Sequence, residues 1–168
     1  MMSNTKKRRV LYIVLEGVLA DTLAGSSIPK DLTDLRVRTE VIEDIIKEPV
    51  TDVVVFSNQT WIYRAPGIRG GEKFYARYRY VTECLREAYN TVSGQDPRIV
   101  GDWSIRFPWV HGLQYDGPTL LEWTWSGDPG LAEAESIGFM CRPIRFDTDF
   151  AGRYGLRTIT VPQGCTNS

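Results

Sequence analysis

Two kinds of segment alternate along the chain: short continuous apolar runs and longer stretches with apolar residues on one helical face. Apolar, β-branched runs at 10–15 and 53–56 are typical of strands buried on both faces. Shorter strands are predicted within 97–110, at 135–140 and at 157–161. Strands that alternate with helices indicate an α/β sheet built from right-handed crossovers.

Helices are predicted where the apolar residues recur at spacings of three and four. The first covers 36–48 and ends before Pro49, with a buried face made of Val41, Ile42, Ile45 and Ile46. The longest covers 72–92, with a stripe made of Phe74, Tyr78, Val81, Leu85, Ala88 and Val92. Two shorter helices are predicted at 120–125 and 147–154. The segment 17–30, with Gly25, Ser26, Ser27 and Pro29, is predicted to be a turn and loop.

The chain length of 168 residues suits one compact domain. We predict a flexible basic N-terminus at 1–8, a single domain at 9–162 and a flexible tail at 163–168. A hydrophobic content of 42% and a charged content of 24% are ordinary for a soluble globular protein. No apolar run approaches the roughly 20 residues of a membrane helix, so we expect no membrane partner. Three widely spaced cysteines favour reduced thiols and a cytoplasmic location.

The segment from Val10 to Thr22 carries the first chemical pattern. It reads Val-Leu-Tyr-Ile-Val-Leu-Glu-Gly-Val-Leu-Ala-Asp-Thr, a buried strand that runs into a glycine turn. It resembles the first motif of the haloacid dehalogenase (HAD) phosphatase superfamily, Asp-x-Asp-Gly-(Thr or Val)-Leu. In this comparison Glu16 replaces the second aspartate. Val14 takes the place of the first, which would be the nucleophile and a metal ligand.

A second pattern follows the strand at 53–56, where the chain reads Val-Val-Val-Phe-Ser-Asn-Gln. It is similar to the family's strand that ends in Ser/Thr-Asn. The form with a third-position glutamine is typical of the branch with polynucleotide kinase 3′-phosphatases and histidinol-phosphate phosphatases. Ser57 and Asn58 are therefore candidate phosphate-binding residues, because a hydroxyl and backbone N–H groups at a strand end can hold phosphate oxygens. Closure of a turn is the alternative role for both.

The third motif of that branch, Arg-Lys-Pro-x-x-Gly-Met-Trp, resembles the segment 115–123. Here the lysine that would neutralise nucleophile and phosphate falls on Gly117, and the arginine falls on Asp116. A glycine in place of a cation, beside a new carboxylate, disfavours a phosphate dianion.

The fourth motif, a strand followed by Gly-Asp, resembles Ser-Ile-Gly-Phe at 136–139. Its metal-binding aspartate falls on Phe139. Asp147 or Asp149 could supply the second acid, although Asp147 also suits the N-cap of a helix.

The resemblance covers 9–161 and implies a Rossmannoid three-layer sandwich with a mostly parallel sheet and little or no cap domain. In the family, four loops at the carboxyl ends of the strands converge on one phosphoryl group. Changes at Val14, Gly117 and Phe139 remove the nucleophile, the neutralising cation and a metal ligand. We therefore expect a catalytically inactive pseudophosphatase with a binding, structural or regulatory role and with no cofactor. The alternative is an active, divergent phosphatase that uses magnesium, Glu16 and Ser57.

A protein is the expected partner, and a nucleotide or nucleic-acid end is the other ligand class that the resemblance suggests. Phosphate contacts would come from basic residues outside the core, namely Lys6, Lys7, Arg8, Arg64 and Arg69. The net charge of −1 gives no general argument for nucleic acid. His111 is the only histidine, so a multi-histidine metal site within one chain is excluded. A dead enzyme would suit a small auxiliary protein of a virus or mobile element, located in the host cytoplasm or particle.

Overall fold

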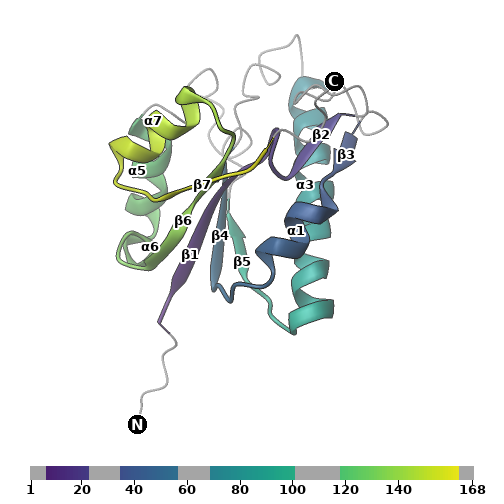
Figure 1. The fold of residues 1–168 in the computed structure, drawn as a ribbon, viewed down its shortest axis with the longest axis horizontal. Coiled ribbons are helices and arrows are strands. Elements are labelled where there is room, and N and C mark those ends of the chain that lie inside the picture. The colour runs from purple at the N-terminus through teal and green to yellow at the C-terminus, as the bar shows by residue number, and fades with distance from the viewer. Residues whose placement is uncertain (1–6, 23–34, 57–68, 101–117, 163–168) are drawn as a thin grey trace.

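Five parallel strands form the central sheet of the computed structural model, which describes residues 7–22, 35–56, 69–100 and 118–162. The strands, in their order across the sheet, are β5 (Arg98–Val100), β4 (Asp52–Phe56), β1 (Arg9–Val14), β6 (Glu135–Cys141) and β7 (Thr158–Thr160). Helices cover both faces, which makes three layers (Figure 1). One face carries α1 (Thr39–Ile45) and α3 (Arg69–Ala88); the other carries α5 (Pro118–Gly127), α6 (Pro129–Ala132) and α7 (Arg145–Arg153). The predicted α/β class with a parallel sheet is confirmed.

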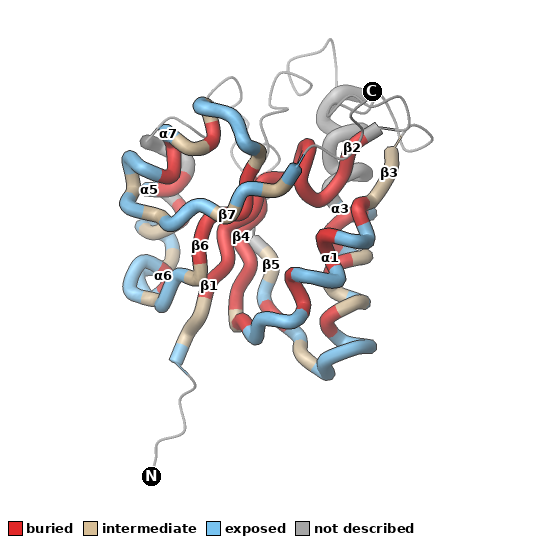
Figure 2. The backbone as a smooth tube through the Cα atoms, viewed as in Figure 1, coloured by how far each residue is buried: buried red, intermediate tan, exposed pale blue. Residues whose placement is uncertain are grey.

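The central strands carry the core. Every residue of β4 is buried, and so is every residue of β1 after Arg9. Figure 2 shows these strands as the buried centre of the molecule. Toward α5 and α7 the core is aromatic: the ring of Phe56 lies 5.4 Å from that of Phe150 and 5.8 Å from that of Phe139. The indole N–H of Trp125 donates to the hydroxyl of Tyr12 at 2.9 Å, which satisfies the polar ends of two large side chains in this layer.

A short antiparallel hairpin follows β1, in a region where a loop and the start of a helix were expected. β2 (Ala20–Thr22) pairs with β3 (Leu35–Val37), and α1 begins only at Thr39. The guanidinium of Arg36 in β3 donates to Asp21 in β2 at 2.9 Å. Three residues of strand are too few to produce a visible period, and the partner strand is separated from them by residues 23–34 in the sequence. The periodicity therefore assigned 36–38 to the helix, which was wrong.

Arg38 links this hairpin to both ends of the domain. Its side chain is 6% exposed, and its Nη1 donates to the carbonyl oxygens of Gly17 and Pro162, each at 2.9 Å. Gly17 lies in the turn after β1, and Pro162 follows β7. One buried guanidinium therefore connects three segments that are distant in sequence.

The long amphipathic helix is present, but its apolar stripe does not continue to Val92. After α3 the chain forms a π-helical turn, η2 (Tyr89–Ser93), in which Tyr89 is buried and Val92 is 73% exposed. A π-helical turn contains more residues than an α-helical turn. The positions whose side chains face the sheet are therefore shifted along the sequence at this point. None of the described helices is both long and apolar enough to cross a bilayer.

Charged side chains tie together the amino ends of the strands. Arg8 donates to Asp52 at the start of β4 at 2.8 Å and to Asp128, the N-cap of α6, at 2.9 Å. Arg98 at the start of β5 also donates to Asp52, at 2.9 Å. Burial alone would raise the pKa of Asp52, but hydrogen bonds from Arg8, Thr51 and Arg98 outweigh it and hold that pKa below its usual value. The hydrogen bond from Arg8 likewise holds the pKa of Asp128 well below its usual range.

This network predicts a specific loss of stability in acid. A carboxyl whose pKa is lower in the folded than in the unfolded chain stabilises the fold above its unfolded pKa of about 4, and this contribution is lost as the pH falls below that value. We expect Asp52→Asn to lower the free energy of unfolding by about 1.5–3 kcal/mol at pH 7, the usual value of hydrogen bonds to a charged group. The difference in unfolding free energy between the variant and the unmodified protein should become smaller toward pH 3. Urea unfolding of both proteins between pH 7 and pH 3 measures this difference.

Asp44→Asn is the matched control, because the Asp44 side chain is 75% exposed and pairs only with Lys47. Its unfolding free energy should follow that of the unmodified protein at every pH. Parallel pH curves for Asp52→Asn and the unmodified protein would contradict the role assigned to the network.

Candidate functional site at the carboxyl ends of the strands

Val14 lies where β1 ends, in the middle of the carboxyl edge of the sheet. It pairs in register with Phe56, the last residue of β4, and both side chains are completely buried. The next amide, of Leu15, donates to the carbonyl of Phe56 at 2.7 Å, so the two strand ends remain joined beyond the last ladder pair. The position that the family resemblance assigns to the nucleophile is thus an apolar contact between two strands.

Glu16 follows in a tight turn that returns the chain to β2. The amide of Gly17 donates to the carbonyl of Ala20 at 2.7 Å, and Gly17 has φ 85°, a left-handed conformation that glycine adopts without strain. Glu16 is only 3% exposed and is engaged in an interaction within the protein. The turn therefore places one buried carboxylate at the carboxyl edge, next to Val14.

Phe139 does not lie at the end of its strand. In the register between β1 and β6, Tyr12 pairs with Phe139 and Ile13 with Met140, so one step further places Cys141 beside Val14. The ring of Phe139 packs in the core, 5.2 Å from that of Phe150. The family resemblance aligned a metal-binding aspartate with Phe139. In the structure Phe139 lies two residues before the carboxyl edge of the sheet.

Gly138, which suggested that comparison, has a packing role in the structure. It has φ 142°, and a Cβ atom there would lie 2.9 Å from the carbonyl oxygen of Arg157 and 2.8 Å from Cδ1 of Ile159. Close approach of β7 explains this glycine without a phosphate-binding loop.

Cys141 and Arg142 are the residues at the carboxyl end of β6. Burial raises the pKa of the Cys141 thiol to about 11, so it is protonated at neutral pH and a weak nucleophile. The guanidinium of Arg142 forms a two-pronged pair with Asp147, with Nε–Oδ2 at 2.9 Å and Nη2–Oδ1 at 2.8 Å. Asp147 is completely buried and also accepts the Arg142 amide at 2.9 Å.

Asp147 does not cap α7 in the way that the sequence suggested. The N-cap residue is Ile144, and Asp147 lies in the first turn, where a negative charge is favoured by the helix dipole. Its carboxylate is held by the guanidinium and the amide of Arg142. Sequence reasoning missed this pair, although an arginine after a strand and an aspartate five residues later were both visible. Asp149, the other candidate acid, is exposed on α7.

Most of the other expected site residues are not described by the structure. These are Ser57, Asn58, Gly117, Lys6 and Arg64. Arg69 is the first residue of α3, in a part where side chains are not described. Lys7 is exposed, whereas Arg8 is bound by Asp52 and Asp128, so its charge is already balanced inside the domain. Within the described ranges, no group of three or more His, Cys, Asp or Glu side chains is placed to hold a metal ion.

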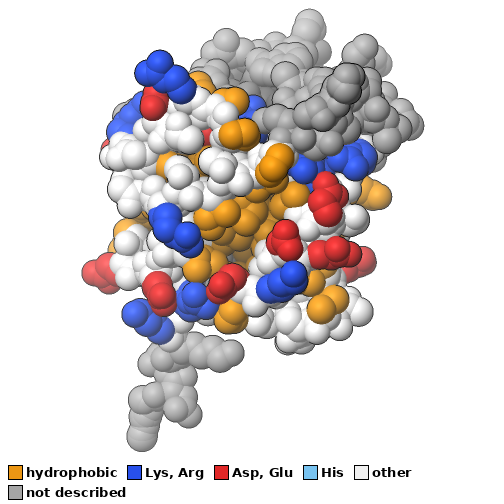
Figure 3. Space-filling view, in the orientation of Figure 1, with side chains coloured by type: hydrophobic (Ala, Val, Ile, Leu, Met, Phe, Trp, Pro, Cys, Tyr) orange, Lys and Arg blue, Asp and Glu red, His pale blue; other side chains and the backbone are white. Residues whose placement is uncertain are grey.

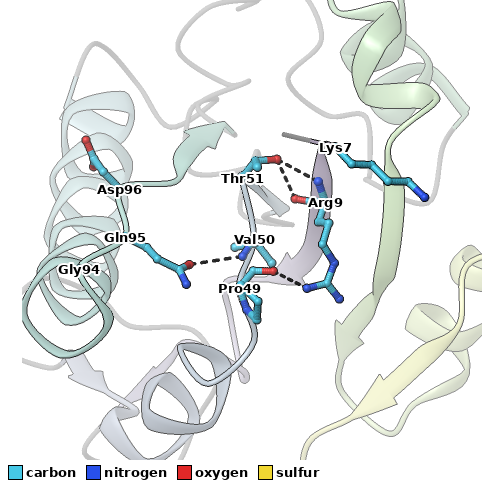
Figure 4. A pocket seen from close by; sticks show the side chains of 8 residues that line it. All are labelled: Lys7, Arg9, Pro49, Val50, Thr51, Gly94, Gln95 and Asp96. Carbon is cyan, nitrogen blue, oxygen red and sulfur yellow. Dashed lines mark hydrogen bonds between the residues drawn. The ribbon is translucent and has the colours of Figure 1, made fainter. Parts of the chain in front are cut away.

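A pocket of about 430 Å³ lies at the opposite, amino-terminal edge of the sheet. It is lined by Lys7, Arg9, Pro49, Val50, Thr51, Gly94, Gln95 and Asp96 (Figure 4). Its wall groups bind one another: Arg9 Nη1 donates to the carbonyl of Pro49 at 2.7 Å, and the Val50 amide donates to Gln95 Oε1 at 3.4 Å. The charged ends of Lys7 and Asp96 point to opposite sides in Figure 4. A ligand site needs polar groups that converge, and these do not.

The Arg142–Asp147 pair predicts an asymmetric response to mutation. We expect Asp147→Ala to lower the free energy of unfolding by about 3–5 kcal/mol, because it leaves a mostly buried guanidinium without its carboxylate. The double variant with Arg142→Met and Asp147→Leu should recover most of this loss, since similar apolar volume replaces both charges. Chemical denaturation of the single and double variants measures the difference. A double variant no more stable than Asp147→Ala would contradict the interpretation.

Comparison with protein-family models and with curated protein sequences found no match to this chain.

Proposed function

We propose that this protein is a non-catalytic binding protein built on a HAD-like phosphatase fold. The arrangement of the sheet supports the proposal. β1, which carries the first motif, is the central strand and lies between β4 and β6, the strands assigned to the second and fourth motifs. Because all three are parallel, their carboxyl ends share one edge, where ligands of open α/β sheets bind.

One observation carries the non-catalytic part of the proposal: among the described residues of this edge, Val14, Cys141 and Arg142 are unsuited to phosphoryl transfer. Val14 has no nucleophilic atom, and the adjacent Cys141 is buried with a pKa of about 11. The first charged group after β6 is the guanidinium of Arg142, which is held by Asp147. A guanidinium has no atom that can ligate a divalent cation, and the carboxylate that binds it is already engaged.

A protein is the proposed partner class. One fewer basic side chain is available to bind nucleic acid than the sequence suggested, because Arg8 is neutralised by two carboxylates. A protein partner needs a rigid surface more than a surplus of charge, and the sheet with its two helical layers provides one. A nucleotide or nucleic-acid end stays as the second ligand class.

An active, divergent phosphatase is the alternative, and Glu16 supports it as a buried carboxylate at the right edge. An assay with magnesium against an aryl phosphate and an oligonucleotide 3′-phosphate separates the two functions. We expect no turnover above the blank, and no change with Glu16→Gln, because Val14 offers no nucleophilic atom at the end of β1. Turnover that disappears in Glu16→Gln but persists in the exposed control Asp44→Asn would establish the alternative.

The ligand class is tested by binding of the same oligonucleotide at several salt concentrations. Binding through phosphates weakens steeply as salt rises, because bound counterions are released. We expect no such salt-dependent binding if a protein is the partner. Tight binding with a steep salt dependence would replace the protein partner with nucleic acid and would leave the absence of catalysis untouched.

A further inference from the structure

The outer edge of β7 is unpaired in the part of the chain that the structure describes. There β7 is the last strand of the sheet and pairs only with β6. In Figure 1 it crosses in front of the other strands, with no element between it and the viewer. Figure 3 shows this face of the molecule in space-filling form. The residues of β7 are exposed at Thr158 and Thr160 and half-buried at Ile159.

The hydrogen bonds to β6 determine which backbone groups face outward. The amide of Phe139 donates to the carbonyl of Arg157 at 2.7 Å, and the amide of Val161 donates to the carbonyl of Cys141 at 2.8 Å. Backbone groups alternate in direction along a strand, so the odd-numbered residues of β7 face β6. The N–H and C=O groups of Thr158 and Thr160 therefore point away from the sheet. Within the described ranges these groups have no hydrogen-bond partner.

The strand is self-complementary. Its sequence, Thr-Ile-Thr, reads the same in both directions. A two-fold axis through Ile159 would place Thr158 of one copy opposite Thr160 of the partner subunit, and the outward groups would form four main-chain hydrogen bonds. Threonine pairs across antiparallel strands are favourable, and β7 has no charged residue that would meet a like charge.

We propose that β7 pairs with β7 of a second copy, antiparallel about Ile159, to join two five-stranded sheets into one. A second copy fits this edge better than an unrelated strand, because the palindromic sequence and the lack of charge make the edge complementary to itself. Isologous contacts of this kind are the commonest basis of dimers. The pairing is short, because Pro162 has no N–H to extend it, so the dimer depends on concentration. This inference is independent of the proposed function.

Cysteine cross-linking tests the register directly. In the proposed pairing Ile159 faces itself in a non-hydrogen-bonded pair, with Cα atoms about 4.5 Å apart, which is within the range of a disulfide. The matched control is Thr158→Cys, whose two copies would lie about 8 Å apart, too far for a bridge. Both variants carry Cys84→Ser and Cys165→Ser, and buried Cys141 stays.

Under mild oxidation we expect Ile159→Cys to form at least ~10-fold more cross-linked dimer than Thr158→Cys, because only the former meets the geometry of a disulfide. Non-reducing electrophoresis measures the yield, and peptide mass spectrometry identifies the bridge. Equal yields from the two variants, or none from Ile159→Cys, would overturn the proposal.

Sedimentation velocity of the unmodified protein gives a second readout that does not depend on any variant. We expect the sedimentation coefficient to rise with protein concentration. It should stay at the monomer value in Thr160→Pro, which removes an outward N–H without touching the ladder to β6. The melting temperature checks that this variant is folded. A sedimentation coefficient of the unmodified protein that stays at the monomer value at every concentration would overturn the proposal.

Discussion

Parallel pairing of β1 with both β4 and β6 is the constraint on which the rest of this structure depends. It makes an apolar strand near the N-terminus the centre of the sheet, so that its side chains are covered on both faces. It also brings together three strand ends, Val14, Phe56 and Cys141, that are successively 42 and 85 positions apart in the chain. Whatever function the carboxyl edge performs, its chemistry is decided by which residue of each strand the register places there.

The two edges of the sheet use arginine–carboxylate pairs for different purposes. At the amino edge Arg8 and Arg98 are partly exposed and share Asp52 and Asp128, which links the beginnings of three strands and a helix. At the carboxyl edge Arg142 and Asp147 form a pair that is almost completely enclosed. The first network is weakened by solvent, whereas the second depends on mutual neutralisation, because a lone charge in that position would be costly. The second pair occupies the part of the fold where a phosphatase would handle charge.

Under the proposed function, Val14 and Glu16 would belong to a motif that keeps its shape without its chemistry. The strand, the glycine with positive φ and the return into a hairpin are present, and they need only apolar burial and one glycine. At the position that the family resemblance assigns to the nucleophile, the side chain of Val14 is buried and pairs in register with Phe56. Phe139, Phe150 and Phe56 pack against one another beneath this edge.

The sequence alone determined the elements whose signal is local. The β-branched runs predicted β1 and β4, the apolar stripe predicted α3, and Gly17 marked the turn after β1, since burial and backbone freedom act within a few residues. Tertiary structure decided what depends on distant partners: the β2–β3 hairpin, the change of phase at Tyr89 and the position of Phe139 within β6. A shift of two residues keeps the same face of a strand, so the apolar pattern of β6 is equally compatible with Phe139 or Cys141 at the sheet edge. Only hydrogen bonding to β1 selects between them, and it places Cys141 at the edge. The guanidinium of Arg142 therefore lies next to the edge, where the sequence had suggested a missing acid.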